Sequence, residues 1–281
     1  MLMHGLFGKG DVALLNEFRG PLIALAVCLV LALLGRATKS ASICAATGAA
    51  GLLAGWYGMS NTPFTLTPRL PVDRLTPLAI VLLLLTWASA RFAARRGLWP
   101  PLLIAALLAA WWLGGAPRAR IEAMAAWQTM AAIAAAVLAT GWLMGGKLAD
   151  PLRPATASLV LAGALWCVAA PWMWVLLALV PAAASLPMLA APKMITLVLL
   201  APATGLAATC ALAELALGRL PRGGFKAIDL AVLSPFIALL LMTALSGRLK
   251  FAGRFSGLLT AVLAGGIAVG AVWGARAARL L

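Results

Sequence analysis

Residues 157–190 read ASLVLAGALWCVAAPWMWVLLALVPAAASLPMLA, a stretch of 34 residues without a charged side chain. As one helix it would measure about 50 Å, whereas the hydrocarbon core of a bilayer is about 30 Å thick. The stretch therefore predicts two membrane-spanning helices that fold back near Pro171, where several tryptophans cluster as they do at membrane interfaces. The alternative is one kinked span followed by a re-entrant segment at residues 181–192.

Apolar runs of this kind recur along the whole chain. The hydrophobic fraction is 64%, and the mean hydropathy is +1.04. Because the runs are unbroken rather than alternating, they predict helices and not the strands of a membrane barrel. The expected fold class is an all-α, polytopic transmembrane helix bundle with ten spans, or nine under the alternative at residues 181–192. The ten spans are expected at about residues 20–35, 40–57, 77–94, 100–115, 123–145, 155–170, 172–190, 195–217, 228–246 and 255–275.

We expect two parts in the domain organisation. Residues 1–19 are interpreted as an interfacial amino-terminal segment, because Leu14, Leu15 and Phe18 share one helical face. Residues 20–281 are interpreted as a single transmembrane helical domain. The abundance of alanine and arginine suggests a bacterial cytoplasmic membrane by association, and the 22 Lys and Arg divide evenly between the two sides, so membrane orientation stays open.

The net charge of +15 does not indicate a nucleic-acid partner. The basic residues of the chain are spread in twos and threes between apolar runs, and they form no basic face or tail. Such residues are typical of interfacial anchors, and the expected partners are the anionic headgroups of membrane lipids.

The longest polar insertion is SNTPFTLTPRLPVDRL, residues 60–75. Its prolines hold the preceding residues extended, so the segment predicts a stiff strap across one end of the bundle or a lid over a cavity between helices. Arg69, Asp73 and Arg74 are the candidate binding residues here, and the alternative is that the two arginines bind lipid phosphates beside a partly neutralising aspartate.

Glu214 is the deepest acidic residue in a predicted span. An ionisable residue inside the hydrocarbon is the best indicator of function in a membrane protein, since burying its charge is costly. We therefore treat Glu214 as a candidate substrate-binding residue. The alternative is an interfacial ion pair with Arg219 or Arg222.

Glycines spaced by four predict close helix packing, either within the chain or against a second copy. The candidate ridges are Gly266, Gly270 and Gly274; Gly51 and Gly55; and Gly141 and Gly145.

Catalytic and metal-binding patterns are weak. Four separated cysteines lie inside predicted spans and are interpreted as packing residues, and the single histidine, His4, lies in the amino-terminal tail. No cofactor or enzyme activity is expected.

We interpret the chain as a permease-like carrier of a small neutral or amphipathic solute, or alternatively as a non-catalytic membrane subunit or assembly factor within a larger complex or homo-oligomer. A lipid-modifying enzyme is a third hypothesis, resting on Asp73 with its two arginines.

Overall fold

The computed structural model describes residues 16–60, 71–92, 99–114, 123–144, 150–190, 195–218, 225–248 and 256–278. Every regular element in these ranges is helical, so the prediction of an all-α fold is confirmed. The long helices are α2 (Arg19–Thr38), α3 (Ala41–Met59), α4 (Leu75–Phe92), α5 (Trp99–Gly114), α6 (Ala123–Met144), α7 (Leu152–Cys167), α8 (Trp172–Ser185), α10 (Leu200–Ala216), α11 (Ala227–Arg248) and α12 (Ser256–Ala277). Three short elements join them: η1 (Pro71–Arg74), η4 (Leu186–Ala190) and α9 (Ile195–Val198).

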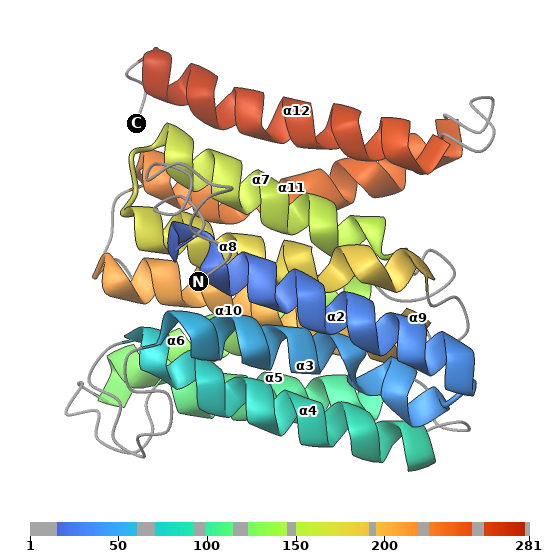
Figure 1. Ribbon diagram of the computed structural model, residues 1–281. Helices are drawn as coiled ribbons and strands as arrows, with labels where there is room; N and C mark the ends of the chain where they lie inside the picture. Colours follow the sequence, from blue (N-terminus) through green and yellow to red (C-terminus); the bar gives the residue numbers. More distant parts are fainter. Residues whose placement is uncertain are drawn as a thin grey trace, which may run out of the picture.

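The long helices lie side by side with their axes along one common direction (Figure 1). Helices that follow one another along the chain pack against each other, as in the pairs α2–α3, α3–α4, α5–α6, α7–α8 and α11–α12. The chain therefore passes back and forth along the bundle, which gives the bundle two distinct ends.

The uncharged stretch that opened the sequence does reverse direction. Helix α7 ends at Cys167, and α8 begins at Trp172, directly after Pro171. Ala169 adopts a left-handed conformation with φ 55°, and the amide of Ala170 donates a 2.9 Å hydrogen bond to the carbonyl of Leu165. This arrangement is a Schellman motif, which satisfies carbonyls at the helix end and stops the helix.

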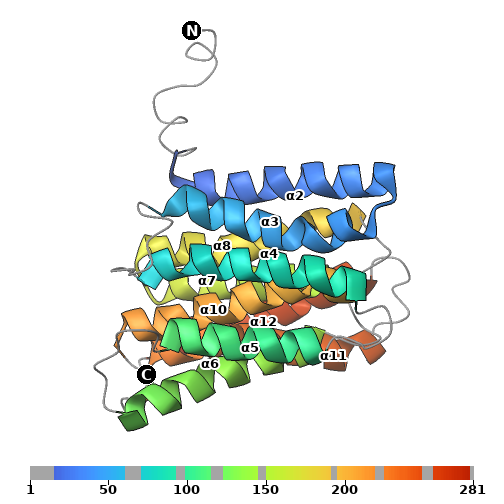
Figure 2. The same cartoon turned by 90° about the horizontal axis from the view of Figure 1, so that it is seen from below.

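Helix α10 occupies the centre of the bundle. It packs against α3, α4, α5, α6, α7, α8 and α11, and every residue from Leu200 to Glu214 is buried. In both Figure 1 and the rotated view of Figure 2, α10 lies between the outer helices, whereas α12 forms the edge of the bundle in Figure 1.

Six helices in the described ranges are long and apolar enough to cross a membrane. They cover residues Arg19–Thr38, Val72–Ala90, Ala126–Met144, Trp172–Leu189, Ala227–Ser246 and Ser256–Ala277. Helices α5, α7 and α10 are apolar but shorter. The fold thus indicates a multi-pass membrane protein, and the count of ten spans stays a prediction. The predicted amino-terminal interfacial segment lies mostly in residues 1–15, outside the described residues.

Candidate functional site: polar clusters at the two ends of the bundle

One cluster of polar contacts lies where α3 ends and α4 begins. Asp73 is 3% exposed, and its Oδ1 accepts a 2.6 Å hydrogen bond from the hydroxyl of Ser60. A buried carboxylate is costly unless it accepts hydrogen bonds. The contact joins the two ends of the proline-rich segment, whose middle, residues 61–70 with Arg69, lies outside the described residues.

Arg74 extends this cluster to α5. Its Nη1 donates a 3.0 Å hydrogen bond to the carbonyl of Leu113, and the indole Nε1 of Trp112 donates a 2.7 Å bond to the carbonyl of Arg74. The last carbonyls of a helix have no partner within the helix and carry partial negative charge. The guanidinium therefore stabilises the end of α5, and we call Ser60, Asp73, Arg74, Trp112 and Leu113 the Asp73 cluster.

A second cluster lies at the opposite end of the bundle, where α6 ends and α7 begins. Arg153 is 4% exposed. Its Nη1 donates a 2.5 Å hydrogen bond to the carbonyl of Leu143 and a 3.2 Å bond to Thr243 Oγ1 on α11. Because α5 and α6 form an antiparallel pair, the carbonyls of Leu113 and Leu143 mark opposite ends of the bundle. We call Leu143, Arg153 and Thr243 the Arg153 cluster.

Sequence reasoning missed this role of Arg153. The expected span begins only at Ala155, which leaves Arg153 in a connection between spans, among the basic residues expected to contact lipid. The available signal was its position in the first turn of a helix, following Asp150 and Pro151. Asp150 Oδ1 accepts a 3.0 Å bond from the amide of Leu152, as a residue at a helix start commonly does.

A third arginine repeats the pattern. Arg276, near the end of α12, donates a hydrogen bond to the carbonyl of Cys167, the last residue of α7. Three arginines thus bind carbonyl groups at the ends of neighbouring helices. In these contacts the arginines bind protein carbonyls, whereas the sequence predicts that basic residues bind lipid headgroups.

Glu214 lies in the last turn of α10 and is 9% exposed. Its place in the bundle follows from the packing of α10 on α3. A Cβ at Gly48 would lie 3.0 Å from Pro202, and one at Gly205 would lie 2.8 Å from Leu52, so α3 and α10 run in the same direction. Both helices therefore end near the Asp73 cluster, and η1 packs against α10. The fold brings Glu214, Asp73 and Arg74 to the same end of the bundle.

The predicted glycine ridges differ in their surroundings. A Cβ at Gly51 would lie 3.2 Å from the carbonyl oxygen of Ala24, and one at Gly55 would lie 3.1 Å from that of Gly20, so α3 approaches the backbone of α2. By contrast, a Cβ at Gly266, Gly270 or Gly274 would meet nothing within 4 Å among the described residues. Of the two partners expected for this ridge, a helix of the same chain or a second copy, the first is absent from the described part. The ridge faces outward because the buried face of α12 is formed by other residues, including Ala264 and Ala268.

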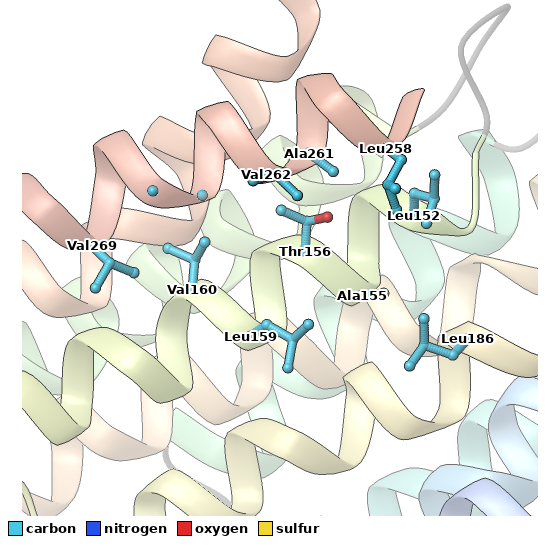
Figure 3. Close-up of a pocket in the computed structure, with 12 residues that line it drawn as sticks. Leu152, Ala155, Thr156, Leu159, Val160, Leu186, Leu258, Ala261, Val262 and Val269 are labelled. Carbon is cyan, nitrogen blue, oxygen red and sulfur yellow. The ribbon is translucent and has the colours of Figure 1, made fainter. Parts of the chain in front are cut away.

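An apolar groove runs beside this ridge on the outer face of the bundle (Figure 3). It lies between α7 and α12 and has a volume of about 370 Å³. Val160 of α7 lies opposite Val269 of α12, and Thr156 supplies a hydroxyl near Val262 (Figure 3). Such a surface suits hydrocarbon rather than polar chemistry.

The described residues hold no group of three or more His, Cys, Asp and Glu side chains that could bind a metal ion. The four cysteines are free thiols, and Cys28 and Cys210 are buried. Cys28 packs where α2 meets α3, because its Sγ lies 2.0 Å from the position of a Cβ at Gly51.

No family model matches the chain, and neither the curated proteins nor the solved structures compared with it include a match. The fold and its apolar helices place the chain in the class of multi-pass, α-helical membrane proteins.

Proposed function

We propose that the protein is a permease-like carrier of a small neutral or amphipathic solute, with all ten long helices spanning a bacterial cytoplasmic membrane. The observation that carries this proposal is the pair of polar clusters at opposite ends of a bundle built around α10. A carrier needs a closed contact at each end, since it opens only one end at a time. The Asp73 cluster and the Arg153 cluster supply two such contacts.

The charge distribution supports a neutral solute. Within the long helices of the described ranges, every Asp, Glu, Lys and Arg lies in the first or last turn, as Glu214 and Arg153 do. The middle of the bundle therefore offers no opposite charge to compensate an ion. A solute that crosses it is best uncharged.

The test measures whether the two ends are coupled, and it requires no knowledge of the solute. Leu113→Cys and Met144→Cys place a thiol beside the Asp73 cluster and the Arg153 cluster, at side chains that are each 1% exposed. The four native cysteines are first replaced by alanine. Labelling by a membrane-impermeant maleimide is then followed from each side of proteoliposomes.

Arg74→Met removes the guanidinium and keeps an apolar side chain. In a carrier, weakening one closed end shifts the population towards the state open at that end. Labelling of Leu113→Cys should become faster, while labelling of Met144→Cys becomes slower. Arg153→Met should give the mirror result, and Arg36→Met, at an exposed position of α2, should change neither rate. A change confined to the mutated end would show a static bundle and contradict the carrier.

One observation favours the alternative of a membrane subunit or assembly factor. The outward face of α12 carries Gly266, Gly270 and Gly274 with open space beside them, and such ridges let a second helix approach closely. Under this alternative, Gly270→Leu lowers the mass of the assembly recovered in mild detergent, and the labelling rates at the two ends are uncoupled.

A further inference from the structure

The groove between α7 and α12 combines a buried floor with exposed rims (Figure 3). Its floor includes Val160 and Ala261, which are 3% and 7% exposed. Its rims carry Leu159 and Val262, which are 49% and 64% exposed. Apart from Thr156, the residues that line it are aliphatic or glycine. The groove is therefore an apolar channel that opens outward, and the outward face of a multi-pass membrane protein meets hydrocarbon.

The two helices that form the groove run in the same direction. A Cβ at Gly257, near the start of α12, would lie 3.5 Å from Leu152, the first residue of α7. A Cβ at Gly163, further along α7, would lie 3.5 Å from Val269, further along α12. Both helices thus begin at the end of the bundle that carries the Arg153 cluster.

The groove extends from this end to the middle of the bundle. Along α7 it reaches from Leu152 to Val160, and along α12 from Leu258 to Val269. At 1.5 Å per residue these stretches measure about 12 Å and about 16 Å. Since the hydrocarbon core of a bilayer is about 30 Å thick, one leaflet contributes about 15 Å. The groove therefore has the length of a single leaflet.

The width of the groove decides between two kinds of occupant. A volume of about 370 Å³ spread over this length corresponds to a mean cross-section of about 25 Å². A helix with its side chains is at least about 10 Å wide, so its cross-section is about 80 Å². Non-bonded carbon atoms approach to about 4 Å, so one extended hydrocarbon chain needs only about 16 to 20 Å². The groove is too narrow for a helix and fits one hydrocarbon chain.

We propose that this groove binds one acyl chain of a phospholipid from the leaflet at the Arg153 end of the bundle. The headgroup stays at that end, and the terminal methyl group lies at the middle of the membrane. A chain in the groove has protein carbon atoms below it and on both sides, so it gains more dispersion contacts than a chain on a flat helix surface. The bound lipid is therefore retained more firmly than its neighbours. This inference goes beyond the proposed carrier function and does not depend on it.

The test uses two photoreactive phospholipids. Both are phosphatidylethanolamines with a diazirine on one acyl chain, placed either next to the ester or next to the terminal methyl group. The full-length protein is reconstituted in vesicles of phosphatidylethanolamine and phosphatidylglycerol that contain one of these probes. It is then purified in mild detergent, which removes freely exchanging lipid, and illuminated. Mass spectrometry of its peptides locates the labelled residues.

The two probes should label opposite ends of the groove. We expect the probe next to the ester to label α12 near Leu258, and the probe next to the methyl group to label it near Val269. The reversed order would show that the chain enters from the other end of the bundle. Label spread evenly over the exposed helices, or absent from the groove, would show that no lipid is retained there. Each of these results overturns the proposal.

Gly266→Leu tests whether the labelling depends on the hollow itself. Gly266 lines the groove, and an added Cβ would meet nothing within 4 Å among the described residues, so the variant should fold normally. Side chains tilt towards the start of their helix, so the leucine would extend into the groove towards Val262. Labelling near Val269 by the methyl-end probe should be lost.

Gly274→Leu is the matched control, because Gly274 is equally open but lies about two turns beyond Gly266 and does not line the groove. It should keep the label near Val269. Loss of the label in both variants, or in neither, would show that the chain does not occupy the groove.

Light scattering on the same samples distinguishes lipid from a second copy of the protein. A retained lipid predicts that Gly266→Leu and Gly274→Leu leave the mass of the protein unchanged. An unlabelled wild-type dimer that both variants convert to a monomer would show that a helix of a second copy covers this face, and it would overturn the lipid site.

Discussion

Arg74 Nη1 lies 3.0 Å from the carbonyl oxygen of Leu113, 39 residues further along the chain. Arg153 makes the equivalent contact with Leu143 at the other end of the bundle. In hydrocarbon surroundings, a helix end cannot rely on water to satisfy its carbonyls. These arginines therefore supply hydrogen-bond donors to the ends of α5 and α6, and each joins two parts of the chain at one end of the bundle.

Arg153→Met should lower the free energy of unfolding by about 1.5 to 3 kcal/mol, the range for hydrogen bonds to a charged group. The loss includes the carbonyl of Leu143, which stays buried without this donor. Thermal or denaturant unfolding in detergent measures the effect. Arg36→Met, at an exposed position, serves as control, and equal stability of the two variants would show that Arg153 is solvated.

Ser60→Ala should cost about 1 to 3 kcal/mol, because it removes a hydrogen bond to the buried carboxylate of Asp73. Ser246→Ala is a suitable comparison, since the Ser246 hydroxyl only bonds the carbonyl of Thr243 within its own helix at an exposed position. The two melting temperatures should differ clearly. A melting temperature for Ser60→Ala as high as that of Ser246→Ala would argue against a structural role for the contact.

Gly51→Leu should destabilise the protein by about 1 to 3 kcal/mol, the usual range for overpacking. A side chain at this position would press on the backbone of α2 at Ala24. Gly270→Leu should leave the stability of the monomer unchanged, since nothing lies within 4 Å of the added carbon among the described residues. Similar melting of both variants in detergent would contradict the assigned packing of the two ridges.

Reporter fusions at Arg95, Lys147 and Arg219 test the number of spans. Ten spans place the fusions at Arg95 and Lys147 on one side of the membrane and the fusion at Arg219 on the other. The reversal at Ala169 and Pro171 is the structural reason for this expectation. Three fusions on the same side would support nine spans.

The sequence predicted the positions of the helices closely. The span expected at residues 123–145 corresponds to α6 (Ala123–Met144), and that at 100–115 to α5 (Trp99–Gly114). Long apolar runs and their polar boundaries carry this information, because the bilayer sets the length of a span.

The packing of the helices was harder to predict. Gly51 and Gly270 lie in similar small-residue patterns, yet one is packed and the other open. In a soluble protein the polar face of a helix marks its outside, but a helix in lipid is apolar on both faces, so its sequence does not mark the buried side. The inward position of Arg153 was missed for a related reason: a charge at a helix end is compatible with either lipid headgroups or the interior.

The central position of α10 has a consequence for biogenesis. Six of the helices that pack on it, α3 to α8, are synthesised before it, so they form before the helix on which they pack exists. Their final arrangement has to wait for α10, and until then the faces that α10 covers lack their packing partner. We therefore expect neighbouring pairs such as α5–α6 and α7–α8 to pack first, and the synthesis of residues 200–216 to be the step that joins these pairs into a bundle.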